Sequence, residues 1–259
     1  MLSPDVVAGL ANDQVRALPV YLGKNQRRVD DFFTVEGDAV GAEPAGVELE
    51  IVGDASRVKW IGRDMTGGRV TVDGNAGMHL GAYMKGGAIE VTGNAGDWPG
   101  AEMAGGFIRV HGNAGGQVGA AYRGDLTGMR DGTILIGGTA GLEVGMRMRR
   151  GTIVVAGGAR DFAGLEMKGG TIVLGGAELR TGAWMARGTI VSLKPIPILP
   201  TFSSASVYNP TFLRLYRRHL DMPGFDIPFE EKDGAYRRYT GDASVTGKGE
   251  IFVWEPRAS

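Results

Sequence analysis

Short stretches of alternating hydrophobic and polar residues recur along the middle of the chain at a nearly constant interval. Each stretch places two apolar residues two positions apart, and β-branched residues dominate these positions. Such alternation is typical of a strand with one buried face. The successive pairs are Val70 and Val72, Ile89 and Val91, Ile108 and Val110, Ile134 and Ile136, Ile153 and Val155, and Ile172 and Leu174, and Ile190 begins the pattern again. We therefore predict one short strand per repeat.

The repeat is about 19 residues long, and its glycines stay in step with the strands. A fixed period of this size predicts a solenoid, in which equivalent strands stack into a parallel sheet. Glycine recurs at the sixth, ninth and thirteenth positions, where a small coil must turn sharply. These structural glycines are Gly74, Gly77, Gly81, Gly93, Gly96, Gly100, Gly112, Gly115, Gly119, Gly138, Gly141 and Gly145.

Two further columns of residues are predicted to fill the interior of the coil. Alanine recurs at the eighth position, where a small inward side chain fits a narrow core. Methionine recurs at the sixteenth position as a flexible filler, and we assign it no metal or haem role. The columns comprise Ala76, Ala95, Ala114, Ala140 and Ala159, and Met84, Met103, Met148 and Met167.

The repeats divide the chain into a solenoid of about seven coils over residues 47–194 and two flanking segments. Exposed coil ends must be capped, so residues 1–46 and 195–259 are the expected caps. In the first cap we expect a short helix with Ser3 as its N-cap and a lead-in strand over residues 29–38. In the second we expect a proline-rich strap over 195–200, a helix over 210–221 and one closing strand.

The glycine spacing G-x-x-G-x-x-x-G within units of about 19 residues resembles the right-handed β-helix domain of the glutamate synthase large chain. It resembles still more closely the C-subunit of formylmethanofuran dehydrogenase and of the related formyltransferase/hydrolase complex. The resemblance covers residues 47–194 and extends to the exit Ile198–Phe202 and the tail Tyr239–Val253. It implies a mainly β fold, a single-stranded right-handed β-helix, and a non-catalytic scaffold subunit in one-carbon metabolism.

Two branches of this family differ in the partners and cofactors that they imply. In the dehydrogenase branch, the partners resemble molybdenum or tungsten and iron–sulfur enzymes. In the other branch, a metal-dependent amidohydrolase-like subunit and a formyltransferase subunit act on formyl groups carried by a methanofuran-type carrier and a tetrahydromethanopterin-type pterin, with hydrolysis to formate. We favour the second branch because arginine outnumbers lysine about threefold, and alanine and glycine abound, as expected from a GC-rich genome.

Composition narrows the function further. The formal net charge of −1 argues against a nucleic-acid-binding protein. The absence of cysteine removes disulfides, zinc thiolates and a cysteine nucleophile. No apolar run approaches the roughly 18 residues of a membrane span, and no secretory signal is evident at the N-terminus, so we expect a cytoplasmic protein without a membrane partner.

We find no catalytic or metal-binding motif. His79, His111 and His219 lie in unrelated contexts, and the carboxylates Glu102, Glu143 and Glu166 are expected to face solvent. A left-handed β-helix acyltransferase would need hexapeptide units, and a calcium-binding solenoid would need aligned aspartates. Neither pattern is present.

Candidate contact residues lie in an insertion, in basic clusters and at tryptophans. The insertion interrupts the third clear repeat and is expected to leave the rod as a loop. This loop is either a tolerated surface loop or a contact with another subunit. Its residues are Tyr122, Arg123, Gly124, Asp125, Leu126, Thr127 and Gly128. Basic groups cluster at Arg147, Arg149 and Arg150, at Arg214, Arg217 and Arg218, and at Arg237 and Arg238. They are either solvated or in contact with another subunit, and Arg214, Arg217 and Arg218 are candidates for binding an anionic carrier tail. Trp60, Trp98 and Trp184 are expected on a flat sheet face that forms the interface.

Overall fold

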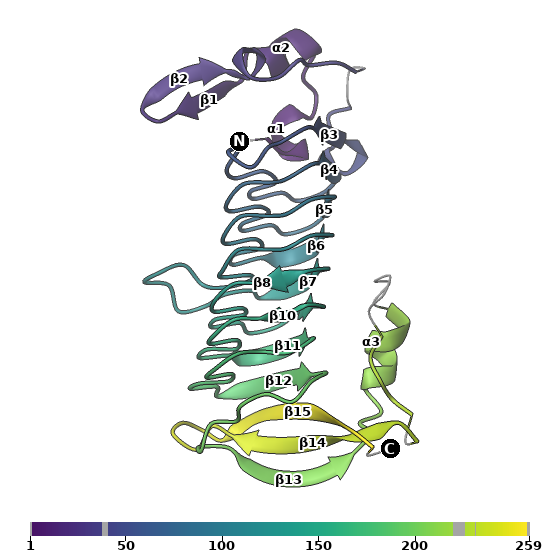
Figure 1. The fold of residues 1–259 in the computed structure, drawn as a ribbon. Helices are drawn as coiled ribbons and strands as arrows, with labels where there is room; N and C mark the ends of the chain where they lie inside the picture. The colour runs from purple at the N-terminus through teal and green to yellow at the C-terminus, as the bar shows by residue number, and fades with distance from the viewer. Residues whose placement is uncertain (1, 38–40, 220–225, 231, 258–259) are drawn as a thin grey trace.

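The middle of the chain winds into a β-helix that forms an elongated rod (Figure 1). The structure is a computed structural model that describes residues 2–37, 41–219, 226–230 and 232–257. Within these residues, eight parallel strands stack in chain order: β3 (Glu48–Val52), β4 (Arg69–Asp73), β5 (Ala88–Val91), β6 (Ala104–Val110), β7 (Asp131–Ile136), β9 (Thr152–Val155), β11 (Lys168–Leu174) and β12 (Arg187–Ser192). They bound seven complete turns, or about eight with the partial turn after β12. The predicted right-handed β-helix is thus confirmed.

The strands pair in the register that the repeat predicts. Ile89 lies opposite Val70 on one side and Ile108 on the other, and Ile108 lies opposite Ile134. Stacking in this register joins the inward side chains into one continuous apolar column. The paired isoleucines and valines, together with Met84 and its equivalents, are fully buried, so the predicted core is confirmed.

A second side of the coil is built from alanine bridges and an asparagine ladder. The repeated alanines pair in parallel from coil to coil, and the short strands β8 (Thr139–Ala140) and β10 (Gly158–Ala159) continue this row. Beside them, the Asn75 Oδ1 accepts the backbone N–H of Asn94 at 2.9 Å, and the Asn94 Oδ1 accepts that of Asn113 at 2.8 Å. Each asparagine thus satisfies a backbone donor that the corner would leave unpaired.

The recurring glycines lie at the corners of the coil. At the thirteenth position φ is positive, +60° at Gly81 and +64° at Gly100, and the missing Cβ faces the isoleucine column. At the ninth position there is no space for a side chain, because a Cβ on Gly77 would meet the backbone of the preceding coil. Positive φ and backbone contact both favour glycine, so its recurrence follows from the geometry of the turns.

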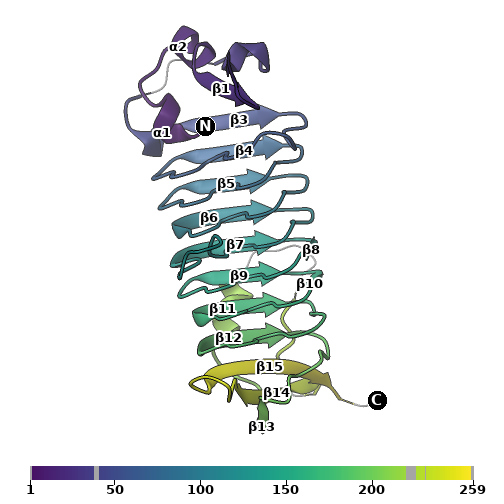
Figure 2. The same cartoon turned by 90° about the vertical axis from the view of Figure 1, so that its left-hand side faces the viewer.

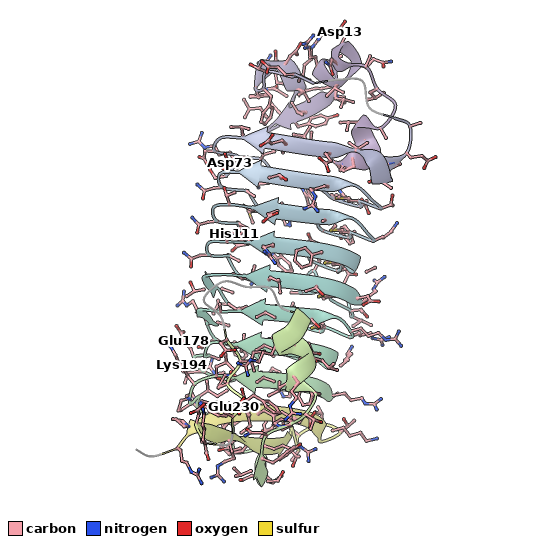
Figure 3. The ribbon with its side chains drawn as sticks, turned by 90° about the vertical axis from the view of Figure 1, so that its right-hand side faces the viewer. Asp13, Asp73, His111, Glu178, Lys194 and Glu230 are labelled. Carbon is pink, nitrogen blue, oxygen red and sulfur yellow. The ribbon has the colours of Figure 1, made fainter. Side chains whose placement is uncertain are left out.

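The outward face of the sheet is polar in the first coils and apolar in the later ones. Its outward residues change from Glu90 and Arg109 to Leu135, Val154 and Val173. The last three residues are buried because helix α3 (Leu213–His219) and residues 226–229 pack over them (Figure 3). The predicted helix over 210–221 is therefore confirmed in its central part, and Asp221 lies outside the described residues.

The N-terminal cap differs from its prediction. Two short helices form instead of one, and Ser3 precedes the first helix, but its hydroxyl makes no capping hydrogen bond. No strand forms over the described part of residues 29–38, because the chain there makes a 3₁₀ turn after a hairpin. The elements are α1 (Pro4–Val7), α2 (Asn12–Arg16), β1 (Pro19–Leu22), β2 (Asn25–Arg28), η1 (Val29–Asp31) and η2 (Pro44–Gly46). Leu2 and Val29 join the core and cover the open end of the first coil.

The C-terminal cap contains three strands where we expected one. After the strap, β13 (Ser203–Tyr208), β14 (Gly234–Gly241) and β15 (Lys248–Pro256) continue the sheet below β12 (Figure 2). The strand β15 pairs parallel to β12, whereas β14 and β13 add antiparallel. The change in direction ends the coil, because the antiparallel strands do not continue the stack of turns.

Candidate partner-binding face

Two positions in most coils, and one in the coil of Gln117, hold a non-glycine residue in the left-handed region of backbone space. Such residues are disfavoured by roughly 1–2 kcal/mol each. Hydrogen bonds between coils hold them there: the backbone N–H of His79 donates to the Asp97 carbonyl at 2.9 Å, and that of Tyr83 donates to the Ala101 carbonyl at 2.9 Å. Among the described residues these are Trp60, Asp64, His79, Tyr83, Trp98, Glu102, Gln117, Glu143, Arg147, Phe162, Glu166, Arg180 and Trp184.

These positions form two columns along one side of the rod and display side chains of varied chemistry. Sequence reasoning missed the columns because residue type changes from coil to coil, so no repeated letter marks them. The only available signal was their constant spacing of two residues before or after the thirteenth-position glycine. The coil therefore holds side chains of different types at regular intervals along the rod.

Aromatic rings gather on this side in the first coils. Trp60 and His79 stack with their ring centroids 4.1 Å apart and an interplanar angle of 11°, and Trp98 continues the row with its centroid 6.5 Å from that of His79. The Arg63 guanidinium lies 4.8 Å from the Trp60 ring centroid, within range of a cation–π interaction. The three stacked rings are half-buried, so each retains surface that a partner could cover.

Tyr122, the first residue of the insertion, completes the cluster. Its ring stacks on Trp98 with centroids 4.8 Å apart, and its hydroxyl lies 2.9 Å from Nδ1 of His79. Burial raises the pKa of the Tyr122 hydroxyl above its usual value. Burial also lowers the pKa of His79, and the nearby charge of Lys59 lowers it further. Both shifts favour the neutral forms, which is the state that a stacked, partly desolvated pair requires.

The rest of the insertion leaves the rod as a projecting loop (Figure 1). Its base is fixed by two cations: Arg147 donates to the Asp125 carbonyl at 2.6 Å, and Lys168 donates to the Leu126 carbonyl at 2.9 Å. The Leu126 side chain is 71% exposed at the loop. An apolar side chain held in solvent on an anchored loop is typical of a contact point, so the partner role predicted for residues 122–128 stays a prediction with a geometric basis.

The environment of Glu102 differs from the prediction. Its side chain was expected to face solvent, but the residue is only 7% exposed because the insertion covers it. Its Oε1 accepts the backbone N–H of Tyr122 at 3.0 Å, and Arg130 lies 3.8 Å away. Burial raises the pKa of Glu102. Glu102 therefore anchors the insertion, whereas Glu143 and Glu166 are half-exposed and bind Gln117 and Arg147.

The tryptophans do not lie where we placed them. Trp60, Trp98 and Trp184 belong to the left-handed turn positions and lie outside the strands, so the expected flat sheet face is wrong. Trp184 is 54% exposed near the C-terminal end, far along the chain from the aromatic cluster. The sheet face itself is polar in the early coils and covered by α3 in the later ones.

The basic cluster proposed for an anionic carrier tail is largely balanced by neighbouring groups. Arg217 forms ion pairs with Asp226 at 3.1 Å and Glu230 at 3.9 Å, and Glu230 is marked in Figure 3. The Arg214 guanidinium lies 4.6 Å from the Phe229 ring centroid. The side chains of Arg218 and His219 lie outside the described residues. The assignment of this cluster to a carrier tail stays a prediction.

One surface hollow of about 520 Å³ lies where the asparagine ladder ends. Its floor is glycine and alanine backbone, and its polar wall is formed by Arg160, Glu178 and Lys194. Arg160 and Glu178 form an ion pair at 3.7 Å, and Figure 3 shows Glu178 and Lys194 along one edge of the rod. Two cations and one carboxylate therefore line this hollow, and one of the cations, Arg160, is paired with the carboxylate.

The described residues contain no group of three histidine, cysteine or acidic side chains placed to hold a metal ion. His111 is exposed and pairs with Glu90 at 2.8 Å, separately from His79. None of the described helices has the length and apolar character needed to cross a bilayer.

We predict that Tyr122→Ala raises the pKa of His79 toward its ordinary value, because the ring that buries His79 is lost. The lowered pKa means that the stabilising contribution of neutral His79 is present above about pH 6.5 and is lost as the pH falls through the folded-state value. The measurement is an NMR titration of the His79 ring. Tyr122→Phe is the control: it retains the ring, keeps the pKa low and removes only the hydrogen bond, worth about 1 kcal/mol. An unchanged His79 titration in Tyr122→Ala would show that Tyr122 does not shield it.

Comparison with known proteins places this geometry in a family. A family model described as "GXGXG motif" matches residues 69–195. The C-subunit of the tungsten-containing formylmethanofuran dehydrogenase 2 of Methanothermobacter thermautotrophicus is 37% identical over 81 residues, 31% of this chain and 30% of the relative. The C-subunit of the molybdenum-containing formylmethanofuran dehydrogenase 1 of Methanosarcina barkeri is 37% identical over 80 residues, 31% of this chain and 26% of the relative. The chain thus aligns with less than a third of the length of these relatives.

A solved structure matches over nearly the whole chain. A chain of the formyltransferase/hydrolase complex (FhcABCD) from Methylorubrum extorquens, solved in complex with methylofuran, superposes with a TM-score of 0.84 and 32% sequence identity. The match covers 97% of this chain and 92% of that chain, so both caps are included with the β-helix. The chain therefore belongs to the C-subunit family of formylmethanofuran dehydrogenases and formyltransferase/hydrolase complexes.

Proposed function

We propose that this chain is the non-catalytic scaffold subunit of a formyltransferase/hydrolase complex. The observation that carries the proposal is the extent of the structural match, 97% of this chain and 92% of a chain of the FhcABCD complex. The dehydrogenase relatives align over only 31% of this chain. The complex would transfer formyl groups between a tetrahydromethanopterin-type pterin and a methanofuran-type carrier, and hydrolyse them to formate.

The surface of the rod supports a structural role. Trp60, Trp98 and Tyr122 present half-buried rings beside Arg63, and aromatic and arginine side chains are the residues most enriched at the centres of protein interfaces. The coil holds these side chains on a rigid backbone, so little conformational entropy is lost on binding. We propose this face as the contact with a catalytic subunit.

The proposed partners are an amidohydrolase-like subunit, which would hold the metal, and a formyltransferase subunit. A carrier, pterin or metal bound to this chain is not part of the proposal. Arg217 already pairs with two carboxylates, so the binding of a carrier tail by its cluster stays a separate prediction. A cytoplasmic location follows from the proposed complex and remains part of the proposal.

A second candidate is the C-subunit of a molybdenum or tungsten formylmethanofuran dehydrogenase. The observation in its favour is the 37% identity over about a third of the chain to dehydrogenase subunits of both metal types. The two candidates share the fold and differ in their partners, so partner identity separates them.

The test is affinity purification of the tagged full chain from its own cells, with the captured proteins identified by mass spectrometry. We expect an amidohydrolase-like and a formyltransferase subunit, and no formyl-carrier hydrolysis by the purified chain alone. Trp98→Ala should reduce capture at least tenfold, whereas Trp98→Phe, which keeps a stacked ring, should retain it. A molybdopterin-type partner would establish the second candidate, and turnover by the isolated chain would contradict the scaffold role.

A further inference from the structure

Two carboxyl groups meet at the base of the insertion. Glu102 projects from the coil and Asp125 from the insertion, and their side chains form a hydrogen bond. Ionised carboxylates only accept hydrogen bonds, so this contact requires a proton on one of the two groups. The Glu102 side chain is only 6% exposed, and burial raises its pKa, so we place the proton there.

Glu102 is held firmly by the coil, whereas Asp125 can move with the insertion. The backbone of Glu102 is in a left-handed position in which its N–H donates to the Ala120 carbonyl at 3.1 Å, and its Oε1 accepts the Tyr122 N–H. Asp125 is exposed on the insertion, which projects from the rod (Figure 1), and no ion pair involves it within the described ranges. If both carboxyls were ionised, movement of the loop at Asp125 would therefore relieve their repulsion.

The cations beside the pair do not replace its proton. Arg130 lies 3.8 Å from the Glu102 carboxyl, but its side chain is 57% exposed, so water screens its charge. Arg147 is already paired with Glu166 at 3.0 Å, and it donates to the backbone carbonyl of Asp125. Neither guanidinium therefore compensates two negative charges at the pair.

Further titratable groups lie on the coil side of the pair. Arg63 and Asp64 form an ion pair at 3.0 Å. The hydroxyls of Tyr83 and Tyr122 face the two carboxyls, and burial raises the pKa of each, so both stay neutral below about pH 10. The contact between the carboxyls thus depends on the proton that they share.

The same contact determines how firmly Leu126 is held, because Asp125 precedes it in the loop. Leu126 is 71% exposed, and its carbonyl accepts a hydrogen bond from the Lys168 ammonium at 2.9 Å. Without the contact to Glu102, the loop here is tied by the long side chains of Arg147 and Lys168. A contact residue that is fixed before binding loses less conformational entropy when a partner binds. Closure of the loop at Asp125 therefore favours binding through Leu126.

We propose that Glu102 and Asp125 form a proton-dependent latch that fixes the insertion against the rod and holds Leu126 in place as a contact for a catalytic subunit. With a proton on the pair, the loop is closed. With both carboxyls ionised, they repel each other and the loop detaches at Asp125. The role of Leu126 rests on the proposed function, whereas the latch is a property of the isolated chain.

The loop should loosen as the pH rises. Because burial raises the pKa of Glu102, the stabilisation of the closed loop is complete below the ordinary value of about 4.3 and is lost as the pH rises through the folded-state value. His79 acts in the opposite direction: burial lowers its pKa, so its protonation in acid would weaken its contact with Tyr122. Loosening at higher pH therefore distinguishes the carboxyl pair from His79.

The test is the mobility of a nitroxide label at Thr127→Cys in the full chain, which has no other cysteine to react with the label. Electron paramagnetic resonance spectra recorded from about pH 5 to about pH 8 should show an immobilised label that becomes mobile as the pH rises. Glu102→Gln keeps an acceptor for the Tyr122 N–H and offers an amide donor to Asp125, so its label should stay immobilised throughout. The control Glu143→Gln removes a half-exposed carboxylate that bonds Gln117, and it should keep the pH response.

A label whose mobility is independent of pH would overturn the latch, and so would a pH response that persists in Glu102→Gln. The role of Leu126 is tested separately by capture of the catalytic subunits at both ends of the pH range. Capture by the wild type should weaken about threefold or more at the higher pH, whereas capture by Glu102→Gln should not. Equal pH dependence of capture in the two chains would overturn this role. Absence of captured subunits at every pH would contradict the proposed function, while the label alone decides the latch.

Discussion

Replacing Gly74 by alanine is expected to lower the free energy of unfolding by about 3 kcal/mol or more. The added Cβ would clash with the backbone of the neighbouring coil, and the alanine would also have to adopt a strained φ. Gly74 has a φ of +144°, which side chains disfavour, and an added Cβ would overlap the carbonyl oxygen of Gly53 in the preceding coil. Backbone atoms of a stacked coil cannot rotate away as a flexible side chain can. The measurement is the urea-unfolding midpoint of wild type and variant, followed by circular dichroism.

The chain offers a matched control for this substitution. Gly53 occupies the equivalent position one coil earlier, has a φ of +108°, and has no atom within 4 Å of an added Cβ. Gly53→Ala therefore tests the backbone conformation alone and should destabilise by about 1 kcal/mol. Equal effects of the two substitutions would mean that the coils shift apart easily and that close stacking does not explain the glycine at this position.

The sequence was sufficient to predict the core of the rod because the core repeats. Val70, Ile89 and Ile108 occupy equivalent positions, and stacking places equivalent positions in contact whatever the details of the corners. The same argument held for the methionine column, which is fully buried at Met84 and Met103. Local pattern and global fold agree in these coils, which is why periodicity alone was informative.

The candidate binding face could not be predicted in this way. Its side chains are held by backbone conformation: Trp60, His79 and Gln117 share a left-handed turn position, but they are three different residue types. The burial of Glu102 depends on how the insertion folds back on the rod, and an insertion has no repeated equivalent to compare with. Sequence reasoning located the insertion but not the stacking of Tyr122 on Trp98.

The ends of the rod were predicted only in outline for a similar reason. The strand β14 pairs with both β13 and β15, and the antiparallel pairing with β13 joins chain segments that are well separated in sequence. A signal was nonetheless present in the outward residues of the later strands. Leu135, Val154 and Val173 point outward and alternate with the inward apolar residues of their strands, so both faces of these strands are apolar. Such a pattern indicates a sheet that is covered on its outside, here by α3.

Asp242 is expected to be the most important single side chain of the C-terminal cap. In each coil the left-handed residue donates its backbone N–H to the next coil, as Glu166 does to the Ala183 carbonyl at 2.9 Å. Trp184 has no further coil, and its N–H donates instead to Oδ2 of Asp242 at 2.9 Å. The other carboxylate oxygen, Oδ1, accepts the N–H of Ser244 at 2.9 Å and its hydroxyl at 2.7 Å. The residue is only 3% exposed.

Asp242→Ala should therefore lower the free energy of unfolding by about 3 kcal/mol, since it leaves buried donors without an acceptor. Asp242→Asn keeps the shape and one oxygen, so a smaller loss is expected, and Ser244→Ala removes a single hydroxyl donor and should have the least effect. The measurement is again the urea midpoint. A stability of Asp242→Ala equal to that of Ser244→Ala would show that the carboxylate does not substitute for the missing coil.

The pH dependence separates the charge of Asp242 from its shape. Burial acts to raise its pKa, but the hydrogen bonds from Ser244 and from the Trp184 N–H outweigh burial and hold the pKa below its usual value. A lowered folded-state pKa means that the stabilisation is complete above the unfolded value of about 3.9 and is lost as the pH falls through the folded value. Wild type should thus exceed Asp242→Asn in stability by a constant amount at neutral pH, and this difference should shrink in acid below about pH 4. If the stability difference stayed constant through the acid range, the negative charge of Asp242 would not contribute to stability. The N–H groups of Trp184 and Ser244 would then need only an oxygen acceptor, charged or neutral.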